Sequence, residues 1–349
     1  MMSQAGLVRI ALAVGIVAII AMSGTSTYAQ PNPYRLVEPW AKLPSGRTWG
    51  YVNGAAVDRE GNIWTFERCG GYTCAGSNLA PLLKFDPSGN LLKSFGAGMF
   101  VFPHGIYVDK DDNVWVTDGG EKDGKGEQVF KFSPDGKVLL TLGKAGVAGE
   151  GPDTFDSPSA VVVAPNGDIF VADGHDFSEF ENRETNARIV KFSKDGKFIK
   201  TWGKKGSAPG EFNKPHAIAM DSKGRLFVAD EHNNRIQIFD QEGKYLEEWK
   251  QFGRPAGIFI DAKDTIYVAD NQSEREGIPG FREGIRIGSA KDGIVTAFIP
   301  ALGACVGSGP CEDRPEKRAS TTEGVAADAM GNIYAAESRT KNFRKYVKK

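Results

Sequence analysis

Two of the four histidines in the chain occupy matching positions in similar segments of sequence. His104 follows a proline in FPHGIYVDKDDNVWVTD, and His216 follows a proline in KPHAIAMDSKGRLFVAD. Glu323 holds the same place in TTEGVAADAMGNIYAAE. Two imidazoles and one carboxylate suit zinc, and less specifically iron or manganese. Brought together with a fourth position left open, these three side chains would form the kind of site that catalytic zinc uses.

Each of these residues also has a structural interpretation. A histidine at the start of a strand can simply make a local hydrogen bond, and Glu323 could pair with an arginine instead of a metal. Two of only four histidines at equivalent places favour the metal over coincidence.

Two further side chains are expected in loops on the same side of the fold. Arg68 lies within TFERCG, and His175 lies within ADGHDFSEF. A guanidinium matches the planar shape of a carboxylate, so Arg68 is a candidate for binding a substrate carboxylate or a developing oxyanion. Its alternative is a surface ion pair. His175 is a candidate proton carrier, because imidazole titrates near neutral pH, or else a solvated loop residue.

An internal repeat predicts the elements that must position these residues. Six segments, beginning near Val52, Phe102, Ser157, Lys214, Arg254 and Thr321, each hold an apolar run, a polar turn and a second apolar run that ends in Asp or Glu. Further runs, as in RIVKFSKDGKFIKTWG, supply a third and a fourth strand in several units. Such alternation predicts four-stranded antiparallel meanders, and six of them spaced by about 40 to 55 residues predict a propeller.

In a propeller the start of the first strand of each blade lies nearest the axis. The residues at this axial position, in blade order, are Asn53, His104, Ser159, His216, Ala256 and Glu323. The two histidines and the glutamate therefore come from alternate blades, about 120° apart in a six-fold ring. Acids recur where the second strands end, so we expect them to have a structural role: Asp118, Asp173, Asp230 and Asp270.

The segment KPHAIAMDSKGRLFVADEHNNRIQIFDQEG resembles the NHL repeat, and weaker copies cover the chain after residue 29. The resemblance implies an all-β fold, a six-bladed β-propeller of NHL-type repeats. The sixth unit stops after FRKYVKK, about one strand short, so we expect YRLVEPWAKLP to supply that strand and close the ring. The expected organisation is a signal peptide over residues 1–29 and a single propeller domain over residues 30–349.

The N-terminal residues have the order of a secretory signal. Arg9 precedes the apolar run IALAVGIVAIIAM, and the small residues Thr27 and Ala29 flank Tyr28. We expect cleavage after Ala29 and a secreted or periplasmic protein. The formal net charge of −1 provides no general attraction to nucleic acid or to an anionic membrane.

Export changes how the four cysteines are interpreted. Cys69 and Cys74 are five positions apart, and Cys305 and Cys311 are six apart. Neither spacing is that of a structural zinc knuckle. In an oxidising compartment we expect two short-loop disulfides, although four cysteines allow three pairings.

The arrangement also resembles the peptidyl-α-hydroxyglycine α-amidating lyase family, six-bladed propellers with a zinc held by three axial histidines. Two of the family's Pro-His motifs match here and carry ligand roles onto His104 and His216, and the family's arginine falls on Arg68. The resemblance implies a metal-dependent lyase that cleaves the C–N bond of a peptidyl-α-hydroxyglycine, releasing an amide and glyoxylate.

The chain departs from the family at two places. The third family motif, Pro-His-Asp, reads TEG here, so Glu323 replaces an imidazole and the Asp that the family associates with structural Ca²⁺ is absent. The family's catalytic tyrosine follows an Asp-Gly pair in blade 3, where this chain has His175. Tyr72, expected on the same side of the fold, is a substitute for it.

Two other classes of function stay open. A Ca²⁺-dependent lactonase or esterase propeller would use oxygen ligands, which Asn53 and Glu323 could supply, but two axial histidines argue against it. A non-catalytic NHL module would instead hold a protein partner on the metal-bearing face. We expect a small-molecule or peptide substrate, or such a partner, and a monomer that binds no nucleic acid and contacts no membrane beyond the signal segment.

Overall fold

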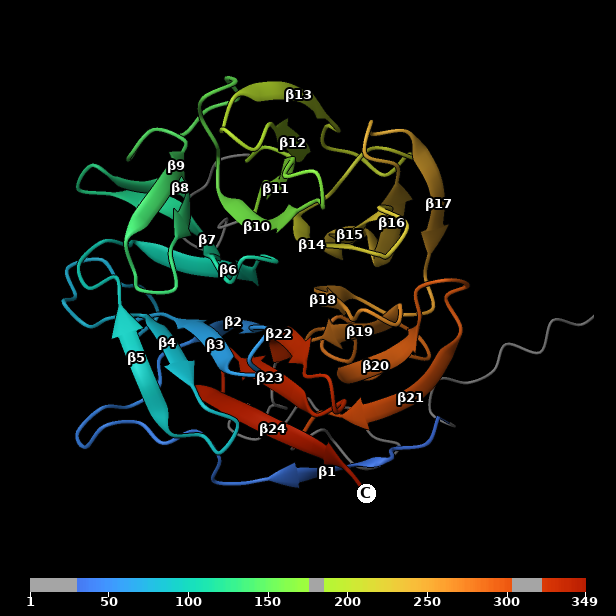
Figure 1. Cartoon of the computed structure of the whole chain (residues 1–349). Helices are drawn as coiled ribbons and strands as arrows, with labels where there is room; N and C mark the ends of the chain where they lie inside the picture. The colour runs from blue at the N-terminus through green and yellow to red at the C-terminus, as the bar shows by residue number, and fades with distance from the viewer. Residues whose placement is uncertain (1–29, 176–184, 303–321) are drawn as a thin grey trace, which may run out of the picture.

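Each sequence repeat folds into a four-stranded antiparallel sheet, and six such sheets surround a central axis (Figure 1). The computed structural model describes residues 30–175, 185–302 and 322–349. Within these ranges the regular secondary structure is β-strand, apart from one short 3-10 helix, η2 (Glu231–Asn233). The predicted six-bladed β-propeller is therefore confirmed. The expected signal segment lies outside the described residues, and none of the described segments forms a helix long and apolar enough to cross a bilayer.

In blades 1 to 3 the strands follow the chain from the axis outward. Blade 1 contains β2 (Val52–Val57), β3 (Ile63–Glu67), β4 (Leu82–Phe85) and β5 (Leu91–Phe95). Blade 2 contains β6 (Phe102–Val108), β7 (Val114–Lys122), β8 (Lys125–Phe132) and β9 (Val138–Leu142). Blade 3 contains β10 (Pro158–Val163), β11 (Ile169–Asp173), β12 (Arg188–Phe192) and β13 (Phe198–Trp202).

Blades 4 and 5 repeat this order. Blade 4 contains β14 (Pro215–Met220), β15 (Leu226–Asp230), β16 (Arg235–Phe239) and β17 (Tyr245–Trp249). Blade 5 contains β18 (Pro255–Ile260), β19 (Thr265–Asp270), β20 (Gly284–Ser289) and β21 (Val295–Pro300).

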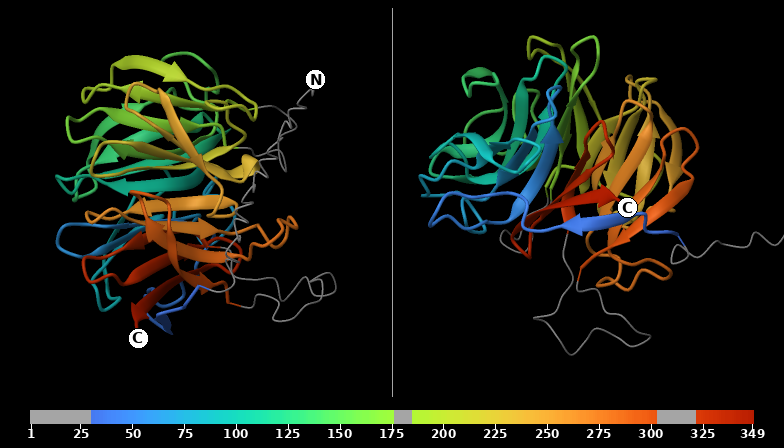
Figure 2. Two further views of the ribbon diagram at one scale, coloured as in Figure 1. Left: turned by 90° about the vertical axis from the view of Figure 1, so that its right-hand side faces the viewer. Right: turned by 60° about the horizontal axis from the view of Figure 1, so that its bottom comes forward.

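Blade 6 is completed from the other end of the chain. It contains β22 (Thr322–Ala327), β23 (Ile333–Glu337) and β24 (Asn342–Lys348), and β1 (Tyr34–Val37) is its outermost strand. β1 pairs antiparallel with β24, with Tyr34 opposite Lys348, and Figure 2 shows the two strands side by side. The ring closure predicted from YRLVEPWAKLP is therefore confirmed.

Aspartate side chains fix the turns between the first and second strands. In blade 1, Oδ1 of Asp58 accepts a hydrogen bond from the backbone N–H of Asn62 (2.8 Å), and Oδ2 accepts one from the indole of Trp64 (3.2 Å). Asp109 accepts the equivalent indole hydrogen bond from Trp115 in blade 2 (3.0 Å). Aspartate favours such turns because its carboxylate bonds to the backbone a few residues ahead.

Apolar clusters fill the spaces between neighbouring blades. Between blades 1 and 2, Trp64 and Phe66 pack with Val114, Val116 and Phe130, all of them buried. Each such side chain contributes about 1.5–3 kcal/mol when it is fully buried. The outermost strands of blades 1 and 3, β5 and β13, consist instead of exposed and half-buried residues. The strands nearest the axis are thus held from both sides and form a rigid frame for the residues at the centre.

Candidate metal centre

The innermost strand of every blade begins with a β-bulge at the axis. The pairing between first and second strands shifts register at Val52/Gly54, Pro103/Ile106, Pro158/Ala160, Pro215/Ala217, Pro255/Gly257 and Thr322/Gly324. The residues inside these shifts include all six predicted axial residues: Asn53, His104, Ser159, His216, Ala256 and Glu323. All six line a central cavity of about 200 Å³. A bulge redirects a side chain away from the regular alternation of a strand, which explains how these residues reach the axis.

Four side chains converge at one end of this cavity. His104, His216 and Glu323 are joined there by His175, and each offers one ligand atom within 4.8 Å of the other three. The ring centroids of His104 and His216 lie 4.7 Å apart. Ligand atoms around a tetrahedral zinc with bonds of about 2.1 Å are separated by roughly 3.4 Å, so small side-chain rotations would complete such a site.

Backbone hydrogen bonds orient two of the imidazoles. Nδ1 of His104 donates to the carbonyl of Ser159 (2.8 Å), and Nδ1 of His216 donates to the carbonyl of Ala256 (2.7 Å). A carbonyl can only accept, so Nδ1 of each ring carries a proton, and Nε2 is the nitrogen that faces the centre. Both Nε2 atoms are buried and have no hydrogen-bond partner within the described chain. A lone pair aimed at the centre, with the other nitrogen bonded to a carbonyl, is the arrangement typical of metal-binding histidine.

The carboxylate of Glu323 is oriented in the same way. Its Oε2 accepts hydrogen bonds from Nδ2 of Asn271 (2.6 Å) and from the hydroxyl of Ser338 (3.1 Å). Its Oε1 lies 3.1 Å from Nε2 of His216. Burial opposes the ionisation of Glu323, but the neighbouring His216, His104 and Lys214 hold its pKa below the usual range. The group therefore presents a carboxylate, the form that binds metals.

His175 reaches the centre from a loop. The backbone N–H groups of Gly174 (3.1 Å) and His175 (2.9 Å) both donate to the carbonyl of Ser157. Gly174 has φ of 135°, and a Cβ atom there would lie 1.7 Å from the carbonyl oxygen of Asn186, so only glycine fits. Burial, with the charges of Lys214 and His104, holds the pKa of His175 well below its ordinary value. The residue predicted as a proton carrier therefore lies among the ligand residues as a neutral, buried imidazole.

Arg68 lies on the blade 1 side of the centre. Its side chain is buried, Nε donates to the carbonyl of Pro103 (3.1 Å), and the guanidinium carbon lies 3.4 Å from the centroid of the Phe102 ring. The half-buried Tyr72 is next to it, with its ring centroid 5.2 Å from the same carbon. Burial lowers the pKa of Arg68 to about 10, which keeps it positively charged at neutral pH.

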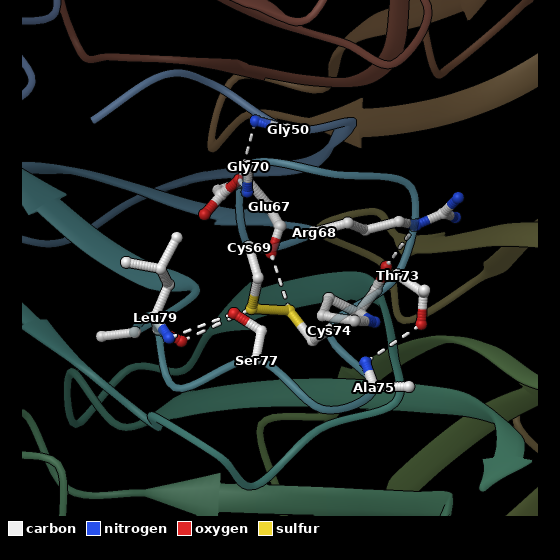
Figure 3. The surroundings of a disulfide bond; sticks show 12 residues. Gly50, Glu67, Arg68, Cys69, Gly70, Thr73, Cys74, Ala75, Ser77 and Leu79 are labelled. Atoms are coloured by element: carbon white, nitrogen blue, oxygen red, sulfur yellow. Dashed lines mark hydrogen bonds between the residues drawn. A yellow bond between two sulfur atoms is a disulfide. The ribbon is translucent and has the colours of Figure 1, made fainter. Parts of the chain in front are cut away.

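A disulfide closes the loop that follows Arg68. Cys69 and Cys74 are bonded to each other, which confirms this predicted pair, and Figure 3 shows the Arg68 side chain extending away from the bridge. Cys305 and Cys311 lie outside the described residues. The bridge, together with the hydrogen bond from the hydroxyl of Thr73 to the carbonyl of Val101 (2.6 Å), ties the loop that carries Tyr72 to the entrance of blade 2.

The recurring acids at the ends of the second strands have the structural role that their repetition predicts. Asp118 accepts hydrogen bonds from the backbone N–H groups of Val101 and Phe102. The three other predicted acids each form a buried ion pair with an arginine on the next strand: Asp173 with Arg188, Asp230 with Arg235, and Asp270 with Arg286. These contacts hold the loops that enter each blade and so shape the mouth of the centre.

The sequence did not identify several residues around the centre. Asn271 and Ser338, which orient Glu323, are in loops with no recognisable motif. Lys214, Glu231 and Arg254 form a buried ion cluster beside His216. The position of Lys214 and Arg254, each directly before the proline that precedes an axial residue, is a signal that could have identified them.

Comparison with known proteins assigns the repeat. Residues 100–122 and 212–239, the segments that carry His104 and His216, match the family model of the NHL repeat. The chain is an NHL-repeat propeller. It is 32% identical over 328 residues to peptidyl-glycine alpha-amidating monooxygenase A of Xenopus laevis, covering 86% of this chain and 33% of that protein. It is 35% identical over 218 residues to peptidyl-alpha-hydroxyglycine alpha-amidating lyase 1 of Drosophila melanogaster, and the match covers 54% of this chain and 38% of that protein.

This NHL-repeat propeller spans about a third of the length of the amidating monooxygenases that it matches. Among solved structures it resembles a gluconolactonase from Xanthomonas campestris, with a TM-score of 0.61 and 93% of each chain covered. Sequence identity in that comparison is 14%, so this likeness concerns the fold alone.

Proposed function

We propose that this NHL-repeat propeller is a metal-dependent lyase that cleaves the C–N bond of a peptidyl-α-hydroxyglycine or a closely related α-hydroxy amide. The observation that carries the proposal is the convergence of three imidazoles and a carboxylate beside a buried arginine. The similarity to proteins named for amidating lyase activity supports the same class of reaction.

The ligand residues fit zinc. Nε2 of His104 and Nε2 of His216 are buried without a hydrogen-bond partner among the described residues, and Oε1 of Glu323 lies 3.1 Å from Nε2 of His216. Imidazole nitrogen suits zinc or iron, whereas calcium takes oxygen ligands, so three imidazoles disfavour the Ca²⁺-dependent lactonase alternative. When bound, the ion would supply a Lewis acid that lowers the pKa of a coordinated hydroxyl. His104, His175, His216 and Glu323 would hold it.

The other residues of the mouth bind the substrate and move protons. Arg68, fixed by Pro103 and stacked on Phe102, would bind the carboxylate of the substrate, since a guanidinium matches a carboxylate in shape and charge. His175 would contribute a ligand nitrogen, so Tyr72, as a phenolate next to the cation of Arg68, would take the proton of the α-hydroxyl at its phenolic oxygen. The hydroxyl carbon then becomes a carbonyl as its bond to nitrogen breaks, and Tyr72 would return the proton to the leaving nitrogen, which regenerates the phenolate. The products are an amide and glyoxylate.

Metal analysis tests the proposal most directly. The protein, purified without a metal-affinity tag, and its His216→Ala variant are compared by inductively coupled plasma mass spectrometry. We expect about one zinc per chain and its loss in the variant. Glyoxylate release from an α-hydroxyglycine peptide is then assayed. Absence of zinc, iron and manganese after supplementation would contradict the proposal and favour a non-catalytic binding module, and iron or manganese in place of zinc would identify a different ion.

We also propose that the protein is exported. The sequence of residues 1–29 has the order of a secretory signal, and the bonded Cys69–Cys74 pair is of a kind that persists in oxidising compartments. N-terminal sequencing of the protein from the culture medium or periplasm tests this proposal, with Gln30 expected as the first residue.

A further inference from the structure

A second ring of side chains surrounds the mouth of the metal centre. It lies two positions before each axial residue and contains Tyr51, Phe102, Ser157, Lys214 and Arg254 in blades 1 to 5. The corresponding residue of blade 6 is outside the described ranges. The ring is asymmetric, because blades 1 and 2 present aromatic rings and blades 4 and 5 present cations. The two sides of the mouth therefore favour chemically different parts of a ligand.

The cationic side is in contact with the metal centre. Nζ of Lys214 lies 2.8 Å from Oε2 of Glu231, and the same oxygen lies 3.8 Å from Nε2 of His216. Nε of Arg254 lies 3.5 Å from Oε1 of Glu231. The side chains of Lys214 and Arg254 are each 10% exposed, and that of Glu231 is fully buried. A group bound by these cations would lie next to a metal-ligand residue.

The charges of this cluster do not balance. Lys214 and Arg254 supply two positive charges, and Glu231 supplies one negative charge. Glu323 also interacts with Lys214, but on the proposed function its carboxylate binds the metal ion and does not compensate the cations. Asp270 accepts a hydrogen bond from the backbone N–H of Arg254, but its carboxylate is paired with Arg286. Nε of Arg254 is buried without a hydrogen-bond partner in the described structure. Burying an uncompensated charge is costly, so the cluster favours a bound anion.

We propose that Lys214 and Arg254 form a second carboxylate-binding subsite, on the side of the metal centre opposite Arg68. Blades 1 and 4 lie across the ring from each other (Figure 1), and Arg68 follows the second strand of blade 1 whereas Lys214 directly precedes the first strand of blade 4. The subsite selects a substrate with two anionic groups, one on each side of the reacting carbon. On the proposed function, on which this assignment of the substrate rests, that substrate is an α-hydroxyglycine peptide whose preceding residue is acidic.

The subsite is tested by anion binding rather than by turnover. Succinate, glutarate and adipate, each beside the monocarboxylate of equal length, are titrated calorimetrically into the metal-loaded protein. We expect at least one dicarboxylate to bind on the order of tenfold more tightly than its monocarboxylate, since charge-assisted pairs of this kind add roughly one such factor. Arg254→Gln and Lys214→Met should each remove this preference.

Substitution of Glu231 should change the dicarboxylate affinity in the opposite direction. Glu231→Gln removes the compensating carboxylate, so dicarboxylate affinity should rise, which misfolding could not produce. Lys341→Met is the matched control, because Lys341 is an exposed cation that contacts the ring of Tyr51 on the other side of the mouth. Metal content is measured for every variant. Equal affinities for dicarboxylates and monocarboxylates, or changes of the same sign in Arg254→Gln and Glu231→Gln, would overturn the proposal.

A lyase assay separates this inference from the proposed function. Glyoxylate release is compared for two α-hydroxyglycine peptides that differ only in a preceding Glu or Gln, and we expect a lower KM for the acidic peptide that Arg254→Gln abolishes. Release without any preference would overturn the subsite and leave the lyase standing. No release from either peptide, with the calorimetric pattern intact, would overturn the lyase and leave the subsite standing.

Discussion

Nε2 of His216 lies 3.1 Å from Oε1 of Glu323, and Nδ1 of the same ring donates a hydrogen bond to the carbonyl of Ala256. An imidazole nitrogen and a carboxylate oxygen thus face each other between blades 4 and 6. Such an approach is favourable when a cation or an added proton lies between them. The pair therefore couples two blades that share no strand pairing.

Metal removal should lower the stability of the whole propeller, because the ion would link ligands from four blades. A ligand that binds only the folded state stabilises it by about 2.7 kcal/mol at a free concentration a hundred times its Kd. We expect the Tm to fall on chelation and to recover on adding zinc. Calorimetry on native and chelated protein checks this, and His216→Ala should show no response to either treatment. An unchanged Tm in the native protein would argue against an ion at the axis.

Glu323→His should increase lyase activity while keeping the metal. Replacing the carboxylate with a neutral imidazole raises the net charge of the centre by one, which strengthens the Lewis acid. We expect metal content to stay near one per chain and kcat for glyoxylate release to rise severalfold. Glu323→Gln, which offers a weaker ligand, is the comparison and should lose metal affinity. A lower kcat in the histidine variant at full occupancy would show that the carboxylate has a further role.

His175→Ala distinguishes a ligand from a base. If His175 binds the ion, removing its side chain should weaken metal affinity by about 10- to 100-fold. Substitutions of residues that only hydrogen-bond to metal ligands already reach this range. His232→Ala is the matched control, since His232 follows the second strand one blade later and is not part of the ligand cluster. Competition with a chelator gives the affinities. Unchanged affinity with a large loss of kcat would instead assign His175 to proton transfer.

Asp118 should make folding stability fall as pH rises. Burial raises the pKa of Asp118 to about 7, against about 3.9 for an unperturbed aspartate. The folded state therefore holds a proton that the unfolded state has lost, so the contribution is full below about pH 4 and declines until pH passes about 7. Asp118→Asn keeps an acceptor for Val101 and Phe102 and removes the titration. Urea unfolding at several pH values should show the native protein losing stability relative to the variant across this window. The same pH dependence of the free energy of unfolding in both proteins would refute the prediction.

Removing the Cys69–Cys74 bridge should weaken substrate binding more than metal binding. A disulfide that closes a loop this short raises the free energy of unfolding by about 2 kcal/mol if it acts through the chain entropy of the unfolded state. The Cys69→Ser/Cys74→Ser variant should unfold at lower urea concentration, keep its metal, and show a raised KM because the loop next to Arg68 and Tyr72 is freer. Metal loss in this variant would mean that the loop also supports the axial ligands.

The sequence predicted the fold and the axial residues because both depend on a repeated pattern. His104, His216 and Glu323 each occupy the same place in a recurring strand, so one alignment located all three. The position of His175 could not be predicted in this way, because it depends on a non-repeated loop in which Gly174 adopts a conformation that only glycine tolerates. Asn271 and Ser338 orient Glu323 through side-chain hydrogen bonds, and such contacts produce no repeated pattern in the sequence.

The six bulges at the axis carry Asn, His, Ser, His, Ala and Glu on nearly the same backbone. Backbone pairing around each bulge does not depend on which of these side chains is present. The propeller thus has six equivalent side-chain positions around one cavity. Substituting a single residue at one of them changes the chemistry of the cavity without requiring a new fold. Evolution of new reactions in such a molecule can therefore proceed by point substitution at the axis, uncoupled from the demands of folding.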